Sequence, residues 1–323
     1  MTSVIKVPPL VTVFGGGGFV GRHVVRALAK RGYRVRVAVR NPNLALHVQP
    51  LGNVGQIQPV QANLRMRWSV DRAVRGADCV VNLVGILYES GRQTFDAVQA
   101  AGARAVAEAA RAEGARLIHV SAIGADPSSP ISYARTKGLA EKAVLDTVEN
   151  AVIFRPSIMF GPDDRFFNRF AAMARLSPVL PLIGGETRFQ PVYVGDVAEA
   201  IARAVDGAVE GGRIYELGGA EARSFRELMQ EMLAVIGRKR LLVSLPWWLA
   251  KLQGRILGLL PKPLLTADQV EMLKRDNVVS SEARMEGRTL EGIGITPQTT
   301  EAILPVYLWQ YRVAGQFTKP TAV

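Results

Sequence analysis

Val11-Thr12-Val13-Phe14-Gly15-Gly16-Gly17-Gly18-Phe19-Val20-Gly21 is the stretch that decides the fold of this chain. A short apolar strand pattern runs into a glycine cluster, and apolar residues at helical spacing follow at Val24, Val25 and Leu28. Glycine permits a tight turn with positive φ, lets the backbone approach a pyrophosphate, and leaves a helix N-terminus facing it. The order therefore predicts a dinucleotide site, which fits either Gly16-x-Gly18-x-x-Gly21 or Gly15-x-x-Gly18-x-x-Gly21.

Arg40, at the end of the second predicted strand, indicates which dinucleotide is bound. A carboxylate at this place binds the ribose 2′-hydroxyl of NAD, whereas a guanidinium suits the 2′-phosphate of NADP(H). The span 1–70 holds ten Lys and Arg and no Asp or Glu. We therefore expect NADP(H), with Arg22 as a second candidate phosphate ligand. The other nearby arginines are expected on a solvated basic face: Arg31, Arg34 and Arg36.

The composition indicates a globular protein of the reducing compartment. Of the 323 residues, 48% are hydrophobic and 21% charged, which excludes a disordered chain. The single cysteine, Cys79, lies in an apolar run and allows no disulfide within the chain. The three histidines show no metal-ligand spacing, so no metal is expected. No secretory signal and no apolar run long enough to span a bilayer is visible, whereas the net charge of +12 indicates an anionic partner.

Strand and helix patterns alternate along the chain, which is typical of a doubly wound parallel sheet. Strands are predicted at 10–14, 34–39, 57–61, 78–84, 116–121 and 151–154, and helices at 19–31, 69–75, 94–113, 134–147 and 224–236. The alternation fades after about residue 219. We therefore predict an α/β chain with a Rossmann-type nucleotide-binding domain at 1–220 and a smaller, mostly helical domain at 221–323.

Tyr133 and Lys137 open the helix that follows the fifth predicted strand. Residues four apart lie on one face of a helix. A lysine in that position can lower the pKa of the tyrosine and hold the nicotinamide ribose, so that the phenol exchanges a proton with a substrate carbonyl. This pair predicts a candidate catalytic site beside the glycine turn.

With this pair, the chain resembles the short-chain dehydrogenase/reductase superfamily in its extended and atypical branches. The resemblance rests on the glycine turn, the run Asn82-Leu83-Val84-Gly85, the Tyr133/Lys137 pair and the segment at 155–162. It implies that Gly15, Gly18 and Gly21 hold the pyrophosphate, that Arg40 meets the 2′-phosphate, and that Lys137 holds the ribose. The expected cofactor contacts are, in full, Gly15, Gly16, Gly18, Phe19, Val20, Gly21, Arg22, Arg40, Asn63, Leu64, Val84, Gly85, Tyr133, Lys137, Pro156 and Ile158.

Two positions depart from the superfamily pattern. Asn63 stands where an Asp near the adenine is usual, and an amide can still donate and accept there. The register of the catalytic serine falls either on Ser121 or on Ala122. If Ala122 holds that register, the oxyanion partner is missing and reductase chemistry is badly impaired.

Further segments are similar to the nucleotide-binding accessory subunit of respiratory complex I, the proton-pumping NADH:quinone oxidoreductase, and its bacterial relatives. This resemblance covers nearly the whole chain. It implies a subunit that binds NADPH structurally and does not exchange electrons with the respiratory chain. The segments are Phe-Gly-Pro-Asp-Asp-Arg-Phe-Phe-Asn-Arg-Phe at 160–170, Thr-Arg-Phe-Gln-Pro-Val-Tyr at 187–193, Leu-Thr-Ala-Asp-Gln-Val at 265–270, Asp-Asn-Val-Val at 276–279 and Glu-Ala-Ile-Leu-Pro-Val-Tyr-Leu at 301–308.

The segment 245–265 predicts an amphipathic helix suited to an anionic membrane surface. One face collects Leu245, Trp248, Leu252, Ile256 and Leu259, and Lys251 and Arg255 mark the other. The alternative is an ordinary core helix of the smaller domain.

Two functions stay open on the sequence. The first is a non-catalytic NADPH-binding subunit of complex I, where Tyr133, Lys137 and Ser121 are vestigial. It is expected on the cytoplasmic face of a bacterial inner membrane, or else on the matrix side of the mitochondrial inner membrane. The second is an active NADPH-dependent reductase on a hydrophobic carbonyl, of the quinone-pathway or isoprenoid type. No nucleic-acid partner is expected, because no basic surface interleaved with aromatic residues is visible.

Overall fold

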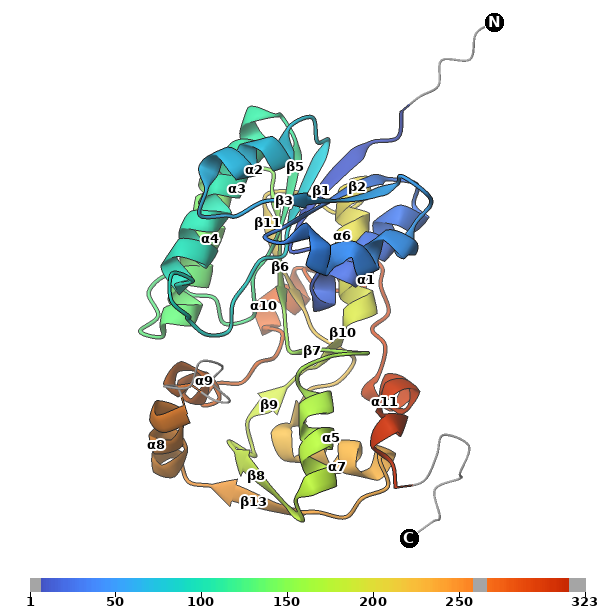
Figure 1. The fold of residues 1–323 in the computed structure, drawn as a ribbon. Helices are drawn as coiled ribbons and strands as arrows, with labels where there is room; N and C mark the ends of the chain where they lie inside the picture. The colour runs from blue at the N-terminus through green and yellow to red at the C-terminus, as the bar shows by residue number, and fades with distance from the viewer. Residues whose placement is uncertain (1–6, 258–265, 314–323) are drawn as a thin grey trace, which may run out of the picture. The chain divides into compact units, whose positions relative to one another are not determined.

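A seven-stranded sheet is the largest sheet of the computed structural model, which describes residues 7–257 and 266–313, with only the backbone for 253–257 (Figure 1). The strand order is β11-β6-β5-β4-β1-β2-β3, and the pairs among β1 to β6 are parallel. The order reverses direction between β1 and β4, which makes their carboxyl ends a switch point for ligands. The strands are β1 Leu10–Phe14, β2 Arg34–Val39, β3 Ile57–Gln61, β4 Cys79–Asn82, β5 Arg116–Val120, β6 Val152–Pro156 and β11 Arg213–Leu217.

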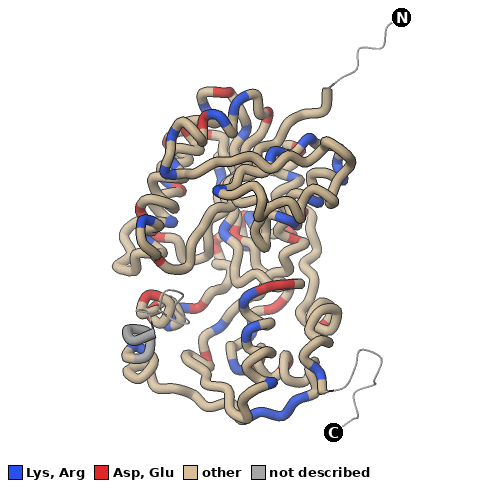
Figure 2. The backbone as a smooth tube through the Cα atoms, in the orientation of Figure 1, with Lys and Arg blue, Asp and Glu red and all other residues tan. Residues whose placement is uncertain are grey.

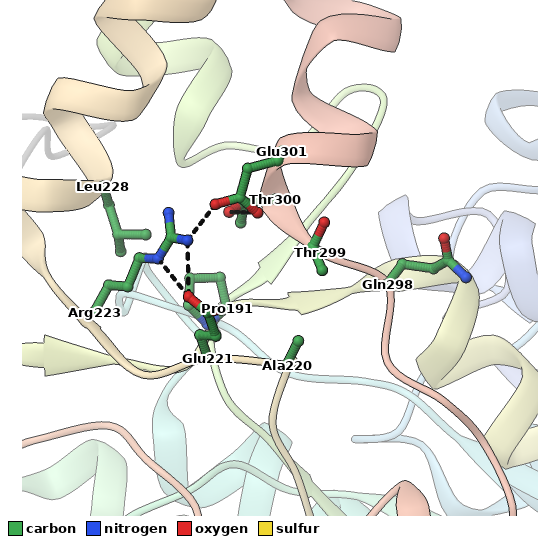
Figure 3. Close-up of a pocket in the computed structure, with 9 residues that line it drawn as sticks. All are labelled: Pro191, Ala220, Glu221, Arg223, Leu228, Gln298, Thr299, Thr300 and Glu301. Atoms are coloured by element: carbon green, nitrogen blue, oxygen red, sulfur yellow. Dashed lines mark hydrogen bonds and ion pairs between the residues drawn. The ribbon is translucent and has the colours of Figure 1, made fainter.

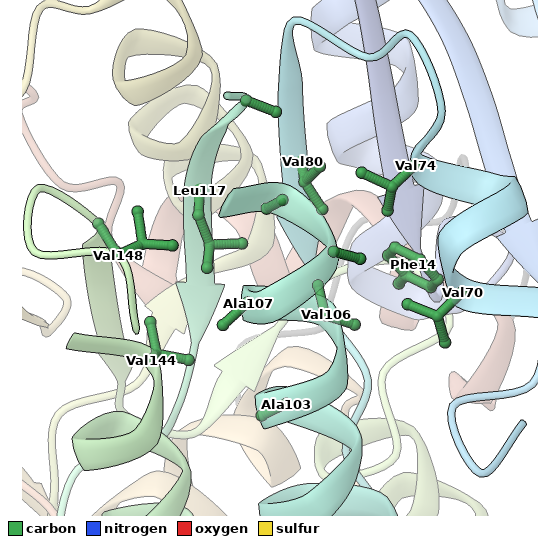
Figure 4. Close-up of a cluster of buried hydrophobic side chains, with 14 of the residues drawn as sticks. Phe14, Val70, Val74, Val80, Ala103, Val106, Ala107, Leu117, Val144 and Val148 are labelled. Atoms are coloured by element: carbon green, nitrogen blue, oxygen red, sulfur yellow. The ribbon is translucent and has the colours of Figure 1, made fainter. Parts of the chain in front are cut away.

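Helices cover both faces of this sheet, which confirms the predicted α/β class. On one face, small side chains of α2, α3 and α4 pack against the strands. The strand residues that they contact include Phe14, Val80 and Leu117 (Figure 4). On the other, α1 and α6 are joined by ion pairs from Arg31 to Glu199 and Asp206. The helices are α1 Phe19–Lys30, α2 Arg67–Val74, α3 Ala101–Ala112, α4 Ser132–Thr147 and α6 Val194–Asp206, with a 3₁₀ segment η1 at Pro42–Leu51.

The predicted helix at 94–113 differs from the structure in its first turn. Residues Asp96–Ala100 form a π-helical turn, η2, before α3 begins at Ala101. Alanine dominates α3, and its buried alanines allow close packing on the sheet. The prediction was otherwise correct, because high helix propensity and an apolar face act together here.

The chain divides into two compact units that interleave in sequence. The first comprises 1–155 and 197–215, and the second comprises 156–196 and 216–323. The sequence-based division at residue 220 differs from this grouping by placing 156–196 with the first unit. The reason is that the second unit is built on strands too short to leave a periodic pattern.

In its described residues, the second unit contains three two-stranded sheets among short helices. β7 Met159–Phe160 pairs with β10 Val192–Tyr193, and β9 Arg188–Phe189 pairs with β12 Arg223–Ser224. β8 Val179–Ile183 pairs in parallel with β13 Leu241–Leu245. The helices are α5 Phe167–Leu176, α7 Phe225–Val235, α8 Trp247–Leu257, α9 Ala267–Met272, α10 Ser281–Met285 and α11 Thr300–Leu308, with 3₁₀ turns η3 Glu291–Ile293 and η4 Trp309–Tyr311.

A buried carboxylate, Asp164, organises the loop before α5. It accepts hydrogen bonds from the backbone N–H groups of Gly161 (3.2 Å), Phe166 (2.9 Å) and Asn168 (3.1 Å). The hydroxyl of Tyr307 on α11 donates to the same carboxylate at 2.5 Å. The loop and α11, 143 residues apart, are thus held together through one side chain.

We expect Asp164→Asn to destabilise the second unit by about 2 kcal/mol, because hydrogen bonds to a charged acceptor contribute roughly 1.5–3 kcal/mol. Tyr307→Phe removes one of these bonds and should cost less. Urea unfolding followed by tryptophan fluorescence measures both. Asp163→Asn is the matched control, since Asp163 is the exposed neighbouring carboxylate and its φ of +65° suits asparagine. Equal destabilisation by the two Asp→Asn changes contradicts the assignment.

Candidate nucleotide-binding site

The glycine turn lies between β1 and α1, as predicted. Gly15 has φ +78°, and its carbonyl accepts the N–H of Gly18 at 3.0 Å. Gly21, in the first turn of α1, packs directly on this turn: a Cβ there would lie 2.3 Å from the Gly15 carbonyl oxygen and 2.5 Å from Gly16 backbone atoms. Only glycine permits this approach of helix to turn.

The N-terminus of α1 is left open toward the turn. Gly18 is the N-cap and offers no side chain to the first N–H groups, and the first turn carries no acidic residue. The backbone N–H groups at Phe19 and Val20 therefore lack an acceptor from a capping side chain. With the positive end of the helix dipole, this N-terminus suits a phosphate.

Arg40 follows the carboxyl end of β2, next to the glycine turn. The N–H of Gly15 donates to the carbonyl of Ala38 at 3.1 Å, which joins the turn to that strand end. Arg40 is exposed, and among the described residues its guanidinium has no ion pair or hydrogen bond. Arg22 instead lies with its guanidinium carbon 5.8 Å from the Phe19 ring centroid. Arg40 is therefore the available cation at this edge.

The solvated basic face predicted for the other arginines holds for Arg34, which is exposed, whereas Arg31 and Arg36 are half-buried and bonded within the fold. Arg31 pairs with Glu199 and Asp206 on α6. Arg34 donates to the carbonyl of Pro8 at 2.8 Å, and Arg36 to that of Ala73 at 2.7 Å. These guanidiniums satisfy carboxylates on α6, the carbonyl of Pro8 before β1 and a carbonyl in the last turn of α2.

Asn63 and Leu64 lie just beyond β3. The Asn63 amide oxygen accepts the N–H of Arg65 at 3.2 Å, and Ser69 Oγ accepts the N–H of Asn63 at 3.0 Å. This Asx turn leaves the Asn63 amide N–H groups without a partner among the described residues. Leu64 packs on α3, where a Cβ at Gly102 would lie 3.0 Å from it.

Two buried polar residues end the central strands, and the sequence reasoning gave neither a role in the site. Asn82, at the end of β4, accepts the N–H of Val84 at 3.1 Å and donates to Nδ1 of His119 at 3.2 Å. Burial and then the charge of Lys137 lower the pKa of His119 to about 3, so the imidazole is neutral. In a sequence, a residue of this kind can be recognised as a polar residue near the carboxyl end of an apolar strand pattern.

Lys137 lies on α4 in a fully enclosed position. Its ammonium donates to the carbonyl of Val120 at 3.1 Å, and a Cβ at Gly85 would lie 3.4 Å from Nζ. Burial lowers the pKa of Lys137 to about 8, against the opposing effect of Glu141. Glu141 is itself held by Arg155 through two hydrogen bonds of 2.9 and 2.6 Å.

Tyr133 precedes Lys137 by one helical turn, as predicted, but its pKa is not lowered. Burial raises it to about 12. The ring packs edge-on against Phe95, with centroids 5.8 Å apart, and the ammonium of Lys137 is directed to the Val120 carbonyl. The expected lowering of the Tyr133 pKa is not seen, because burial acts on the phenol; the role of Tyr133 as a proton donor stays a prediction.

Ser121 follows β5 and is buried. Its N–H donates to the carbonyl of Phe154 at 2.7 Å, whereas its Oγ has no hydrogen-bond partner among the described residues. Ala122 is half-buried beside it. An unpartnered buried hydroxyl is costly unless something satisfies it, so Ser121 is available to a bound group. Its assignment as the catalytic serine stays a prediction.

Pro156 and Ile158 belong to the second unit. The N–H of Ile158 donates to the side-chain oxygen of Asn277 at 3.1 Å, and the Ser157 hydroxyl donates to the same oxygen at 2.7 Å. The Gln190 N–H donates to the Asn277 carbonyl at 3.1 Å. Asn277 thus joins the segments 157–158 and 190 within the second unit.

Two cavities of the second unit were not expected from the sequence. One, of about 10 Å³, has Arg223 against Glu221 (2.8 Å) and Glu301 (Figure 3), and Arg223 also pairs with Glu231 at 3.1 Å. It holds no more than a water, so the cluster serves packing. The other, of about 480 Å³, is lined by Arg188, Gln190, Gly218, Ala220, Ala222, Val278, Val279, Arg284, Thr289 and Glu291. No metal-binding group of His, Cys, Asp and Glu occurs in the described part of the chain.

The buried ammonium of Lys137 predicts a specific pH dependence of stability. Between its folded pKa of about 8 and the ordinary 10.5, the unfolded chain holds a proton that the folded chain has lost. Stability relative to Lys137→Met should therefore rise with pH across this window, by up to about 3 kcal/mol. Urea unfolding at several pH values measures the difference. Lys142→Met, at an exposed lysine of α4, is the control; parallel profiles for wild type and Lys137→Met contradict the prediction.

Known proteins resemble this chain over most of its length. Residues 11–218 match the NAD dependent epimerase/dehydratase family. The mitochondrial NADH dehydrogenase (ubiquinone) 1 alpha subcomplex subunit 9 of Arabidopsis thaliana is 35% identical over 95% of this chain and 79% of its own. A ceramide reductase of Caulobacter vibrioides is 34% identical over 73% of this chain and 74% of its own.

The fold is shared with a solved structure, the NADPH-dependent quinone oxidoreductase of Escherichia coli complexed with NADPH. The two structures superpose with a TM-score of 0.71 at 22% sequence identity. The superposition covers 90% of this chain and 97% of that one. This likeness confirms the Rossmann-type architecture. By its matches, the chain belongs to the NAD dependent epimerase/dehydratase family and, within it, to the family of the NADH dehydrogenase (ubiquinone) 1 alpha subcomplex subunit 9.

Proposed function

We propose that this protein is a non-catalytic, NADP(H)-binding accessory subunit of the proton-pumping NADH:quinone oxidoreductase, complex I. The observation that carries the proposal is the similarity to subunit 9, which extends over 95% of the chain and so includes both units. The role is to stabilise the junction of the peripheral arm and the membrane. Complex I subunits are its partners.

The residues at the carboxyl ends of β1, β2 and β4 fit a nicotinamide dinucleotide. A Cβ at Gly21 would fill the space in which helix and turn meet, and the open N-terminus of α1 suits the pyrophosphate. Arg40, with no partner of its own among the described residues, supports a 2′-phosphate and hence NADP(H). The free amide N–H groups of Asn63 suit an adenine edge, and Lys137 a ribose.

Three features support a site that binds the cofactor but does not catalyse a reaction with it. Burial raises the pKa of Tyr133 to about 12, so its phenol is a weak proton donor near neutral pH. Lys137 is engaged with the Val120 carbonyl. Ser121 is buried at the end of β5. The bound cofactor supplies hydride-transfer chemistry in active relatives of such folds; here these side chains serve to hold and enclose it.

The second candidate is an active NADPH-dependent reductase on a hydrophobic carbonyl, of the quinone-pathway or isoprenoid type. The specific observations in its favour are the helical pair Tyr133 and Lys137 and the 34% identity to a ceramide reductase. In this case Tyr133 donates the proton to the carbonyl oxygen, and Ser121 binds that oxygen.

We propose peripheral attachment to the inner membrane, on the cytoplasmic side of a bacterial membrane or, alternatively, on the mitochondrial matrix side. The structure has no helix in its described residues that could span a bilayer. The segment 245–265 is proposed as one contact with anionic lipid. In α8, Trp248 and Leu252 are exposed on one face, and Lys251 pairs with Glu271 at 3.1 Å; Ile256 and Leu259 lie outside the residues with described side chains.

Replacing Arg40 tests the cofactor preference. Arg40→Ser should weaken NADPH binding roughly ten- to a hundredfold, because it removes a charge-assisted contact to the 2′-phosphate, and should leave NADH binding nearly unchanged. Isothermal titration calorimetry measures both affinities. Arg26→Ser, at an exposed arginine of α1, is the matched control. An equal loss for NADPH and NADH assigns Arg40 another role.

Purification from gently solubilised membranes tests the subunit role. A tagged chain should bring down complex I subunits in stoichiometric amounts, and Tyr133→Phe should leave both recovery and NADH:quinone turnover unchanged. Mass spectrometry and activity assays measure this. Recovery of the chain alone, with NADPH-dependent carbonyl reduction that Tyr133→Phe abolishes, supports the reductase instead.

A further inference from the structure

The two-stranded sheet of β8 and β13 has one face in the core and one facing out. Its strands run parallel with Val179 beside Leu241 and Pro181 beside Val243. Side chains alternate along each strand. Leu180, Leu182 and Leu242 belong to the core of the second unit. The other face is made by Val179, Pro181, Leu241 and Val243.

This outer face is apolar and exposed. Leu241 is 63% exposed, and Val179 and Val243 are each 37% exposed. Leu176, at the end of α5 and just before β8, is 89% exposed. Single exposed apolar residues are ordinary, but here four aliphatic side chains come from one strand pair and the helix end that leads into it. Such a contiguous patch indicates an interaction site.

Four basic residues lie at the same end of this sheet. Arg175 precedes Leu176, and Arg238, Lys239 and Arg240 lead directly into β13, where Figure 2 shows a continuous blue stretch of tube. The backbone holds two of them in place. Arg240 donates to the carbonyl of Ala174 at 2.7 Å, and Arg238 to that of Tyr311 at 3.0 Å.

The charges in this cluster are not compensated. The pKa of Arg238 is lowered by burial and by the positive charges of Arg240 and Arg175. Within residues 7–257 and 266–313, none of the four cations forms an ion pair. Like charges held together favour an anionic partner, which relieves their repulsion.

We propose that this patch, named the β8/β13 patch and consisting of Leu176, Val179, Leu241 and Val243 with Arg175, Arg238, Lys239 and Arg240, binds the surface of a bilayer containing anionic phospholipid. The bilayer interface presents phosphates beside acyl chains, which matches cations beside exposed aliphatic side chains. The proposal rests on the peripheral membrane attachment proposed above. It adds a second contact surface, whose residues all lie outside the segment 245–265.

Co-flotation of the full chain with lipid vesicles tests the β8/β13 patch. The chain should bind phosphatidylcholine vesicles that contain phosphatidylglycerol, bind pure phosphatidylcholine vesicles far less, and lose binding as salt rises. Lys239→Glu should weaken binding roughly tenfold or more, since each basic residue near the surface contributes about 1 kcal/mol. Leu241→Ser should weaken it by about tenfold through lost apolar burial.

Matched controls come from the first unit. Lys142→Glu changes an exposed lysine, and Leu44→Ser changes a leucine that is 76% exposed; both should leave vesicle binding unchanged. Equal losses from patch and control variants, or equal binding to both kinds of vesicle, overturn the proposal. Patch variants that bind vesicles normally but no longer recover complex I subunits assign the patch to a protein partner. Anionic vesicle binding that depends on the patch, without recovery of complex I, retains the patch and rejects the subunit role.

Discussion

The close packing of α1 on the glycine turn is the constraint on which the first unit depends. No side chain fits at Gly21, because its Cβ position lies 2.3 Å from the Gly15 carbonyl oxygen. The turn is tied in addition to the end of β2 by the bond from Gly15 to Ala38. The close approach at Gly21 thus sets the position of α1, and with it the position of its open N–H groups, relative to the turn. The bond from Gly15 to Ala38 joins the same turn to the strand end before Arg40. The glycine turn that packs α1 on the sheet is therefore also the turn that is expected to bind the nucleotide.

A second constraint is the enclosure of charge around Lys137. Its ammonium faces the Val120 carbonyl, and Glu141 with Arg155 supplies further charges behind it. Burial disfavours the charged form of a side chain, which lowers the pKa of Lys137 to about 8. The raised pKa of Tyr133 has the same origin.

The first unit was predictable because its signals are local. The first three strands, β1 to β3, have the bounds expected from apolar runs, and α1 and α4 agree within two residues. In the site, the positions of Arg40 and Lys137 followed from strand ends and helical spacing. The pKa of Tyr133 did not, because it depends on neighbours such as Phe95 that spacing does not reveal.

The second unit was less predictable because its contacts are distant and its strands short. Asp164 and Tyr307 are 143 residues apart, and Ser157 meets Asn277 across 120. The sequence identified these segments only by resemblance. The outer face of β8 and β13 was missed, since strands of five residues with both faces partly apolar show no clear alternation.

The nucleotide content of complex I purified through this chain tests the central claim most directly. The complex is isolated by a tag on this chain, and nucleotides are released and quantified before and after NADH:quinone turnover. We predict NADP(H) in stoichiometric amount with the chain, with its redox state unchanged by turnover. A complex without NADP(H), or a bound nucleotide that is oxidised and reduced at the rate of turnover, would contradict the account.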